Sequence, residues 1–250
     1  MTAYSKQLII FDLDGTLTVS KSPMASDVAE LIVNLLERKK VAIISGGAFP
    51  QFQTEFLAML PGSTENYSNL YLLPTSGTRL YTWKGDWTQQ YAENLSPADK
   101  DKIMAALNYA LKSANYVKPE VTYGPLIEDR GSQITFSALG QKAPVDQKYA
   151  WDPTNARREL IVSVLHDKIP EFDARIGGAT SVDITRKGVN KAYGIHKLEE
   201  YLKIPIDQMV FIGDKLMYGG NDYPAKSTGV DCIQVSGPDE AKKLIESWLV

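Results

Sequence analysis

Two aspartates separated by a single residue, Asp12 and Asp14, directly follow the apolar run Leu8–Phe11. A run of this length that ends in a glycine turn is typical of a strand buried on both faces of a parallel sheet. The two carboxylates then lie at the carboxyl end of the strand, where open α/β sheets bind ligands. Burying two ionised carboxylates so close together is costly unless a cation or other partners compensate their charge. This stretch therefore indicates a functional site rather than a structural turn.

Two further apolar runs end in polar residues in the same way. Val41–Ile44 precedes Ser45, and Met209–Ile212 precedes a glycine and then Asp214. The carboxyl ends of parallel strands meet at one edge of a sheet, so we expect these residues to converge on one pocket. Lys191 falls in the first turn of a predicted helix, where the helix N-terminus adds positive potential.

The charges of these residues predict a metal ion. Asp12, Asp14 and Asp214 outnumber the single cation of Lys191, so the pocket is anionic when all three aspartates are ionised. A phosphate dianion would not enter such a pocket without a metal. Carboxylates and phosphate oxygens suit Mg²⁺ better than a softer metal, and the chain contains only two histidines. The sequence thus predicts Mg²⁺-dependent chemistry on a phosphorylated substrate.

The elements that must position these residues follow an α/β pattern at both ends of the chain. Apolar residues recur at helical spacing in 23–40 and in 190–202, and strand-forming residues with tight turns occupy 70–87. A strand, a helix and a second strand in succession form a βαβ unit, whose crossover is right-handed. We predict an α/β fold with a Rossmann-like parallel-sheet core made of residues 1–86 and 185–250.

Residues 87–184 follow a different pattern. A helix begins at Ser96-Pro97, a strand covers Gln133–Leu139, and another helix opens at Asp152-Pro153. Two short strands flank Gly177-Gly178, which gives the order β-α-β-β-α-β. We predict that 87–184 forms a small α+β domain inserted into the core.

The composition argues against several classes of function. The hydrophobic fraction of 44% and the charged fraction of 23% are ordinary for a soluble globular protein. A net charge of −3 gives no support to binding of nucleic acid or of an acidic membrane. No apolar stretch approaches the roughly 20 residues of a membrane span, and the single cysteine, Cys232, fits a reducing cytosol. We expect a cytoplasmic protein, either monomer or homodimer, whose partner is a small phosphorylated metabolite.

The polar residues also match a known family in their order. Asp12-Leu13-Asp14-Gly15-Thr16-Leu17-Thr18 resembles the first motif of the haloacid dehalogenase superfamily. Its second, third and fourth motifs are matched in order by Ser45, by Lys191, and by Gly213-Asp214 with Asn221-Asp222. The insertion lies where this superfamily carries its α/β (C2-type) cap. The long Gly-Asp to Gly-Gly-Asn-Asp spacing of 213–222 is similar to that of the eukaryotic-type α-phosphomannomutases.

The resemblance implies a role for each matching residue. Asp12 would attack phosphorus to form an aspartyl-phosphate, and Asp14 would act as the acid and base. Ser45 would donate a hydrogen bond to the phosphoryl group, and Lys191, or Lys187 if the alignment shifts, would offset its charge. The implied Mg²⁺ ligands are Asp12, the backbone carbonyl of Asp14, Asp214, and Asn221 or Asp222.

Substrate contacts are implied in the same way. The matching positions are Lys21 and Gly46 in the predicted core, and Arg130, Gln141, Ser181 and Asp183 in the insertion. The subgroup has an arginine where this chain has Lys21. Of its three cap arginines only Arg130 is retained, since Gln141 stands at the second position and Lys148 falls near the third.

These departures bear on the reaction. Glutamine cannot replace the charge of an arginine, and lysine lacks its forked geometry. The sequence therefore favours a phosphatase acting on a sugar phosphate or a similar metabolite. The alternative is a phosphomannomutase, an isomerase with a bisphosphate intermediate, in which Lys142, Arg157 and Arg158 would compensate. A sensor without catalysis is a third class, disfavoured because every catalytic position is filled.

Overall fold

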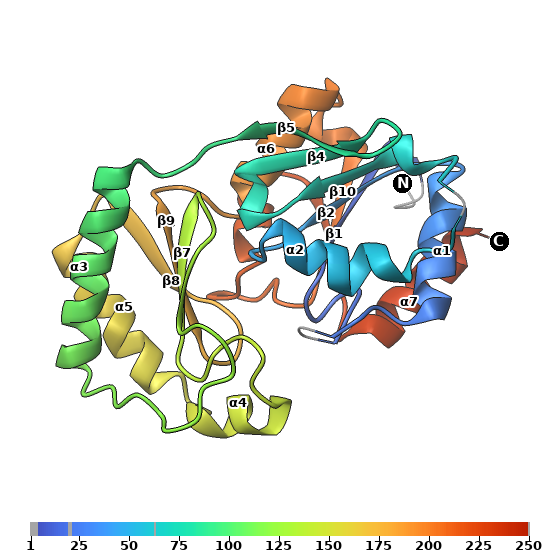
Figure 1. The fold of residues 1–250 in the computed structure, drawn as a ribbon. Helices are drawn as coiled ribbons and strands as arrows, with labels where there is room; N and C mark the ends of the chain where they lie inside the picture. The colour runs from blue at the N-terminus through green and yellow to red at the C-terminus, as the bar shows by residue number, and fades with distance from the viewer. Residues whose placement is uncertain (1–4, 20–21, 63, 250) are drawn as a thin grey trace. The chain divides into compact units, whose positions relative to one another are not determined.

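The computed structural model describes residues 5–19, 22–62 and 64–249 of the 250-residue chain (Figure 1). These residues form two compact units. One is the insertion, Glu93–Gly188, and the other is the core, which comprises the described residues up to Ala92 and from Val189 onward. Lys21, a predicted substrate contact, lies outside the described residues.

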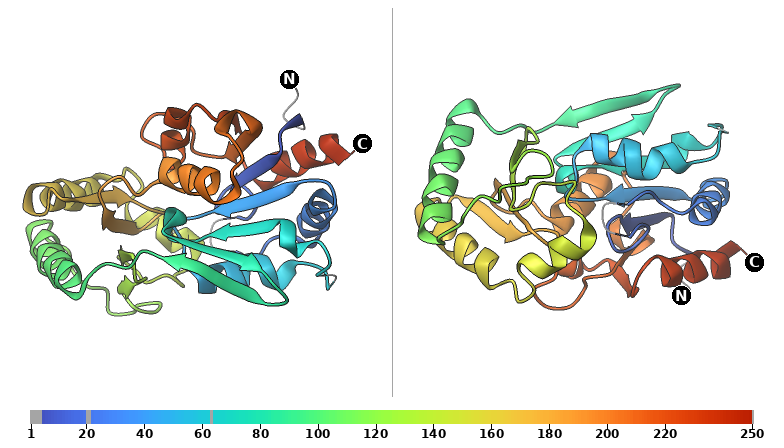
Figure 2. Two further views of the ribbon diagram at one scale, coloured as in Figure 1. Left: turned by 90° about the horizontal axis from the view of Figure 1, so that it is seen from above. Right: turned by 60° about the horizontal axis from the view of Figure 1, so that its bottom comes forward.

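The core strands form one mixed sheet. They are β1 (Leu8–Asp12), β2 (Lys40–Ile44), β3 (Leu70–Leu73), β4 (Arg79–Trp83), β5 (Trp87–Ala92), β10 (Met209–Gly213) and β11 (Asp231–Gln234). The seven strands are ordered β11-β10-β1-β2-β3-β4-β5. The pairs from β11 to β3 are parallel, whereas β4 and β5 join through antiparallel pairs. The β4–β5 hairpin, teal in Figure 2, forms one margin of this sheet.

Helices cover both faces of the core sheet. They are α1 (Ser26–Leu36), α2 (Phe49–Gln51), α6 (Lys191–Leu202) and α7 (Pro238–Leu249), with a π-helical turn η2 (Phe52–Phe56) and 3₁₀ turns η3 (Leu57–Met59), η4 (Tyr67–Asn69), η5 (Thr75–Gly77), η6 (Ile206–Gln208) and η7 (Tyr223–Thr228). α1 and α7 pack together on one face, and α6 packs with η7 on the other (Figures 1 and 2). Ile9 and Phe11 face the first layer and Leu8 and Ile10 the second, all fully buried. Burial on both faces explains the continuous apolar runs of the sequence.

The insertion is a sheet with helices on one face. Its elements are α3 (Pro97–Ser113), β6 (Ile127–Asp129), β7 (Gln133–Ser137), α4 (Val145–Trp151), α5 (Ala156–Lys168), β8 (Phe172–Ile176) and β9 (Ser181–Arg186). The strands are antiparallel in the order β6-β7-β9-β8. α3 and α5 pack on the face that carries Phe136 and Val182 (Figure 1). Because side chains alternate along a strand, the opposite face carries polar residues such as Thr135 and its register partner Asp183.

The α/β fold class with an inserted α+β unit is confirmed, and the bounds of the insertion differ from the prediction by a few residues. The core sheet is parallel from β11 to β3 and antiparallel at β4 and β5. The insertion runs from Glu93 to Gly188 instead of 87–184, because β5 pairs with β4 and because Arg186 pairs with Phe172 of β8. A terminal strand belongs to the sheet that satisfies its backbone groups, which composition does not reveal. Within the described part of the chain, no helix combines the length and the apolar character needed to span a membrane.

Candidate active site

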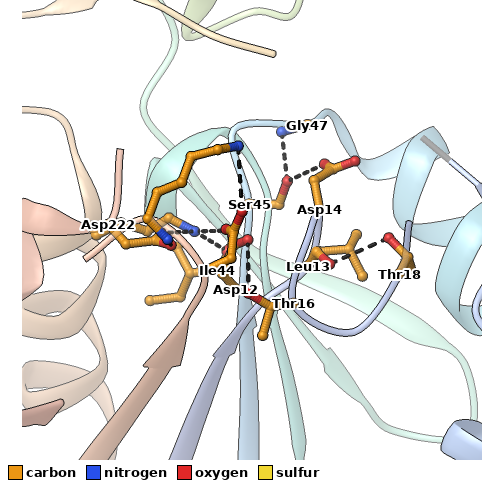
Figure 3. Close-up of polar contacts among 12 residues, drawn as sticks. Asp12, Leu13, Asp14, Thr16, Thr18, Ile44, Ser45, Gly47 and Asp222 are labelled. Atoms are coloured by element: carbon orange, nitrogen blue, oxygen red, sulfur yellow. Dashed lines mark hydrogen bonds and ion pairs between the residues drawn. The ribbon is translucent and has the colours of Figure 1, made fainter. Parts of the chain in front are cut away.

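Three parallel strands bring distant residues to one edge of the core sheet. β1 lies between β2 and β10, and Asp12 at the end of β1 is the register partner of Ile44 at the end of β2. Ser45 follows Ile44 directly, and Asp214 follows the last residue of β10. Figure 3 shows Asp12, Asp14 and Ser45 grouped at these strand ends. The sheet topology thus assembles a single polar site from segments that are far apart in the sequence.

The loop after β1 is closed by its own backbone. The Leu13 carbonyl accepts hydrogen bonds from the amides of residues 16–18 at 3.0 to 3.3 Å, and the Gly15 amide donates to the Thr18 carbonyl at 2.8 Å. Gly15 has a φ of +90°, a conformation that L residues rarely adopt. A Cβ at this position would lie 2.5 Å from Asp214 Oδ2. Glycine is therefore needed both for the turn and for the close approach of the Asp214 carboxylate.

The Asp12 carboxylate is buried and paired with a buried lysine. Each of the two residues is only 2% exposed. Lys191 Nζ donates hydrogen bonds to Asp12 Oδ1 and to the Ile44 carbonyl, and it lies 3.4 Å from Asp222 Oδ1. The Thr16 hydroxyl donates to Asp12 Oδ2 at 3.4 Å. These contacts fix the orientation of a carboxylate that could attack a substrate.

The start of α6 determines which lysine reaches the site. Lys191 is the first residue of α6, and the side chain of Asn190 caps the helix by accepting a hydrogen bond from the Tyr193 amide at 3.2 Å. Lys187 is exposed and donates to the Pro170 carbonyl within the insertion. Of the two lysines that the sequence left open, the structure therefore brings Lys191 to Asp12.

The site carries an excess of negative charge. Burial raises the pKa of Asp12 to about 8, against the opposing effect of Lys191, and Asp222 and Asp14 add to the rise. Burial by itself would lower the pKa of Lys191, but Asp12 and Asp222 outweigh it and the pKa is raised. Burial also raises the pKa of Asp214. The single charge of Lys191 therefore does not balance the carboxylates grouped around it.

The same carboxylates fit a metal ion. Asp12, Asp214 and Asp222 each offer an oxygen, and these oxygens lie within 4.8 Å of one another. Within the described residues, Asp214 Oδ1 and Asp222 Oδ1 are buried and accept no hydrogen bond. Asp222 Oδ1 has the Lys191 ammonium 3.4 Å away as an ion pair, so both oxygens remain able to coordinate a hard divalent cation. Of the two predicted alternatives, Asp222 is fully buried beside the other carboxylates, whereas Asn221 is exposed.

Asp14 belongs to a second network, which includes residues that were not predicted. Ser45 Oγ accepts a hydrogen bond from the Gly47 amide at 3.0 Å and donates to Asp14 Oδ2 at 3.4 Å. Gln51 Nε2 donates to the same Asp14 oxygen at 2.9 Å and to Glu55 Oε2 at 2.8 Å. The available signal was two polar residues four apart on one helix face. Their nearness to Asp14 depends on where α2 begins, which the sequence did not show.

A strained turn supports the loop that follows β2. Gly46, a predicted substrate contact, is partly buried, and the carbonyls on either side of it accept hydrogen bonds at 2.9 Å from the amides of Thr75 and Ser76. Thr75 and Ser76 have φ values of 49° and 58°, and positive φ is a genuine outlier for a β-branched residue. A Cβ on Gly77 would lie 2.6 Å from the Cα of Gly194 in α6. This turn therefore braces both the Ser45 loop and the helix that carries Lys191.

The polar face of the insertion carries further predicted substrate contacts. Ser137 and Ser181 are register partners whose hydroxyl oxygens lie 2.9 Å apart, and Gln141 Nε2 donates to Ser137 Oγ at 2.5 Å. On the neighbouring pair of residues, Asp183 Oδ1 accepts a hydrogen bond from the Thr135 hydroxyl at 2.7 Å. The structure thus brings Gln141, Ser181 and Asp183 to one side of the same sheet.

The cations of the insertion are largely committed to internal contacts. Arg130 donates through Nε and Nη2 to Glu128 Oε2 at 3.1 and 2.8 Å. Arg158 is 3% exposed, donates through Nε to Asp152 Oδ2 at 2.9 Å, and also bonds the Gly178 carbonyl. Burial would raise the pKa of Asp152, but hydrogen bonds from the Arg158 side chain and from the amides of Arg157 and Arg158, together with the Arg158 charge, lower it. Arg158 is therefore a structural residue and not a replacement for a missing phosphate-binding arginine.

The remaining cations differ in their surroundings. Lys148, near the third arginine position, is 8% exposed on α4. The Arg157 guanidinium lies 5.4 Å above the Trp151 ring on an exposed face of α5. Lys142 is exposed.

Comparison with known proteins assigns the family. The family model for eukaryotic phosphomannomutase matches residues 28–250. The chain belongs to the eukaryotic phosphomannomutase family. A probable phosphomannomutase of Caenorhabditis elegans is 27% identical over 258 aligned positions, covering 99% of this chain and 97% of the relative. A phosphomannomutase of Schizosaccharomyces pombe is 29% identical, covering 88% of this chain and 85% of the relative.

Two solved structures share the fold of this phosphomannomutase family member. A haloacid dehalogenase-like hydrolase from Bacteroides thetaiotaomicron superposes with a TM-score of 0.62 at 15% identity, covering 97% of this chain and 99% of that one. An N-terminally truncated IMP-nucleotidase from Plasmodium falciparum gives 0.73 at 18% identity, covering 98% and 70%. The fold that the resemblance to the haloacid dehalogenase superfamily implied is thereby confirmed.

Proposed function

We propose that this protein is a Mg²⁺-dependent hexose phosphate mutase of the phosphomannomutase type, with Asp12 as the nucleophile. The observation that carries the proposal is the buried Asp12–Lys191 pair beside two carboxylates, each with a buried oxygen that accepts no hydrogen bond, in a chain of the eukaryotic phosphomannomutase family. The relatives named phosphomannomutase span nearly the whole chain, which supports the isomerase more than the phosphatase that the sequence favoured.

The proposed reaction consists of two phosphoryl transfers. In the first, an Asp12 carboxylate oxygen attacks phosphorus, the P–O bond to the sugar breaks, and the leaving oxygen takes a proton from the Asp14 carboxyl. In the second, a hydroxyl of a hexose phosphate gives its proton to Asp14 and attacks the phosphorus of the aspartyl-phosphate, which releases Asp12. Transfer of the phosphoryl group from Asp12 to a hexose phosphate creates a hexose bisphosphate. Transfer of the other phosphoryl group of this bisphosphate to Asp12 then leaves the isomeric hexose phosphate.

The neighbouring residues stabilise charge during both transfers. Lys191 already contacts the attacking carboxylate, so its ammonium is positioned to offset charge on the phosphoryl oxygens. Ser45 lies beside Asp14, and its hydroxyl is positioned to donate a hydrogen bond to the phosphoryl oxygens. Mg²⁺ held by Asp12, Asp214 and Asp222 would supply further neutralisation of the phosphate charge.

A phosphatase acting on a hexose phosphate or a similar metabolite is the second candidate. It is favoured by the departures from the three cap arginines of the subgroup, because a mutase needs forked cations to hold a second phosphate. Gln141 stands at one arginine position, Arg130 is paired with Glu128, and Arg158 is buried against Asp152. In a phosphatase, water rather than a sugar hydroxyl would give its proton to Asp14.

One set of reactions tests both candidates. Purified protein with Mg²⁺ is given mannose 1-phosphate and glucose 1-phosphate, with and without a trace of hexose bisphosphate, and both the 6-phosphate and free phosphate are measured. Isomer formation that the bisphosphate stimulates supports the mutase, and phosphate release without isomer supports the phosphatase. Binding without either product contradicts both. Asp12→Asn is the control, because a folded variant that keeps its activity would exclude Asp12 as the nucleophile.

A further inference from the structure

Gln51 connects two carboxylates through a single neutral amide group. Its Nε2 donates at 2.9 Å to Asp14 Oδ2 and at 2.8 Å to Glu55 Oε2. The hydrogen bond to Asp14 is shorter than the one that Ser45 donates to the same oxygen at 3.4 Å. Gln51 therefore holds the carboxylate that the proposed mechanism uses as acid and base, without adding charge to the site.

Gln51 is itself held from both sides. Gln51 Oε1 lies against Gly47, and a Cβ on that glycine would overlap with the side-chain amide of Gln51. The backbone carbonyl of Glu55 accepts a hydrogen bond from the Met24 amide at 2.7 Å, which ties this residue to the segment before α1. Gln51 immediately precedes the π-helical turn η2, whose Phe52 is fully buried. Single π-helical turns of this kind are rare and occur frequently at functional sites.

We propose that Gln51, anchored by Glu55, is a positioning residue that orients Asp14 for proton transfer. The proposal rests on the proposed phosphoryl transfer through Asp12 but not on the identity of the natural substrate. Proton transfer requires the carboxyl group to lie within hydrogen-bond reach of the reacting oxygen. Without the amide, Asp14 would turn about its side-chain bonds and lose this geometry, while Asp12 would keep its own contacts with Lys191.

The two halves of the reaction differ in their need for that proton transfer. When p-nitrophenyl phosphate is the substrate, Asp12 attacks phosphorus, the ester P–O bond breaks, and nitrophenolate leaves with the bonding electrons and without a proton. In the second half, water attacks the aspartyl-phosphate, its proton goes to Asp14, and inorganic phosphate is released. A displaced Asp14 should slow only the second half. A sugar oxygen is a poor leaving group, so with a hexose phosphate both halves should slow.

The test compares Gln51→Met with Gln53→Met, the same substitution at an exposed glutamine two residues away. With p-nitrophenyl phosphate and Mg²⁺, we expect Gln51→Met to lower kcat about tenfold or more. We expect KM to fall by a similar factor, so that kcat/KM stays within about twofold and a burst of nitrophenolate appears. With any hexose phosphate that is turned over, kcat/KM itself should fall. Gln53→Met should match the wild type, and Glu55→Gln, which keeps an acceptor oxygen, should give a smaller effect in the same direction.

Other results would overturn the proposal. An equal loss of kcat/KM for both substrates would mean a general structural defect, and unchanged kinetics would mean that Gln51 does not orient Asp14. A wild-type protein that turns over p-nitrophenyl phosphate but isomerises no hexose phosphate would remove the mutase while leaving the role of Gln51 intact. A wild-type protein that releases no nitrophenolate would remove phosphoryl transfer and the role of Gln51 together.

Discussion

Replacing Gly15 with alanine tests whether the close approach of the first loop to Asp214 matters for metal binding. The added Cβ would lie 2.5 Å from Asp214 Oδ2, closer than real Cβ contacts allow. Gly85, in the turn between β4 and β5, provides a matched control. Its φ of +88° nearly equals the +90° of Gly15, but a Cβ there would meet no atom within 4 Å. The two substitutions therefore share the backbone strain and differ in the clash.

The expected sizes of the two effects can be separated. Alanine in this left-handed conformation costs roughly 1–2 kcal/mol of folding stability, and this cost should appear in both variants. In Gly15→Ala the Asp214 carboxylate must also retreat by roughly 1 Å to reach ordinary van der Waals contact, the range that begins at 3.4 Å. Displacing groups that orient a metal site typically lowers metal affinity about 10–100-fold. We expect that loss for Gly15→Ala and an unchanged Mg²⁺ affinity for Gly85→Ala.

The assay is a Mg²⁺ titration of both variants and the wild type, followed by the rise in thermal unfolding midpoint and by turnover of p-nitrophenyl phosphate. Gly85→Ala should lose stability at every Mg²⁺ concentration but keep the wild-type half-saturation point. Gly15→Ala should require about 10–100 times more Mg²⁺ for half-saturation. If the two variants have the same half-saturation point, Asp214 is not a metal ligand in the arrangement that the structure describes.

Three further predictions follow from individual contacts. Arg158→Met leaves the buried Asp152 carboxylate without its cation and should lower the free energy of unfolding by about 3–5 kcal/mol. The same substitution at the exposed Arg157 should change it by less than about 0.5 kcal/mol. Denaturant unfolding of the two variants measures both changes. Gln141→Arg should raise the ratio of isomer to free phosphate if this position faces a second phosphate, and an unchanged ratio argues that it does not. Burial raises the pKa of Asp12 from 3.8 to about 8 and also raises that of Asp214, so the folded state binds protons that the unfolded chain has released. The free energy of unfolding in chelator should therefore fall as the pH rises from 3.8 towards 8 and be partly restored by Mg²⁺; a flat pH profile in chelator melts would contradict this.

Local patterns predicted much of the fold because they report local physics. The helix predicted to begin at Ser96-Pro97 does begin there as α3, and Ser96 and Asp99 exchange hydrogen bonds between side chain and backbone. The continuous apolar runs of β1, β2 and β10 predicted burial on both faces, and these strands lie in the middle of the sheet. β5 was assigned to the wrong unit, because the hydrogen bonds that place it come from β4 rather than from its own residues.

The cations of the insertion show where residue types alone are insufficient. Arg157 and Arg158 are adjacent and chemically identical, yet one is exposed above Trp151 and the other is buried against Asp152. Only the start of α5 and its packing decide which side chain faces the interior. The sequence could therefore name both as candidates for phosphate binding but could not discard Arg158.

The sequence by itself was enough to predict the kind of site that the core sheet carries. Apolar runs ending in Asp12, Ser45 and Asp214 are sufficient to predict a parallel sheet with a polar, anionic edge, because burial on both faces and the shared direction of the strands are encoded in the runs themselves. The tertiary structure decided which groups complete that edge. Lys191 was selected over Lys187 by the start of α6, and Gln51 was brought to Asp14 by the helix that follows β2. These choices depend on side-chain contacts between segments far apart in the chain, and no periodicity or spacing within one segment carries that information.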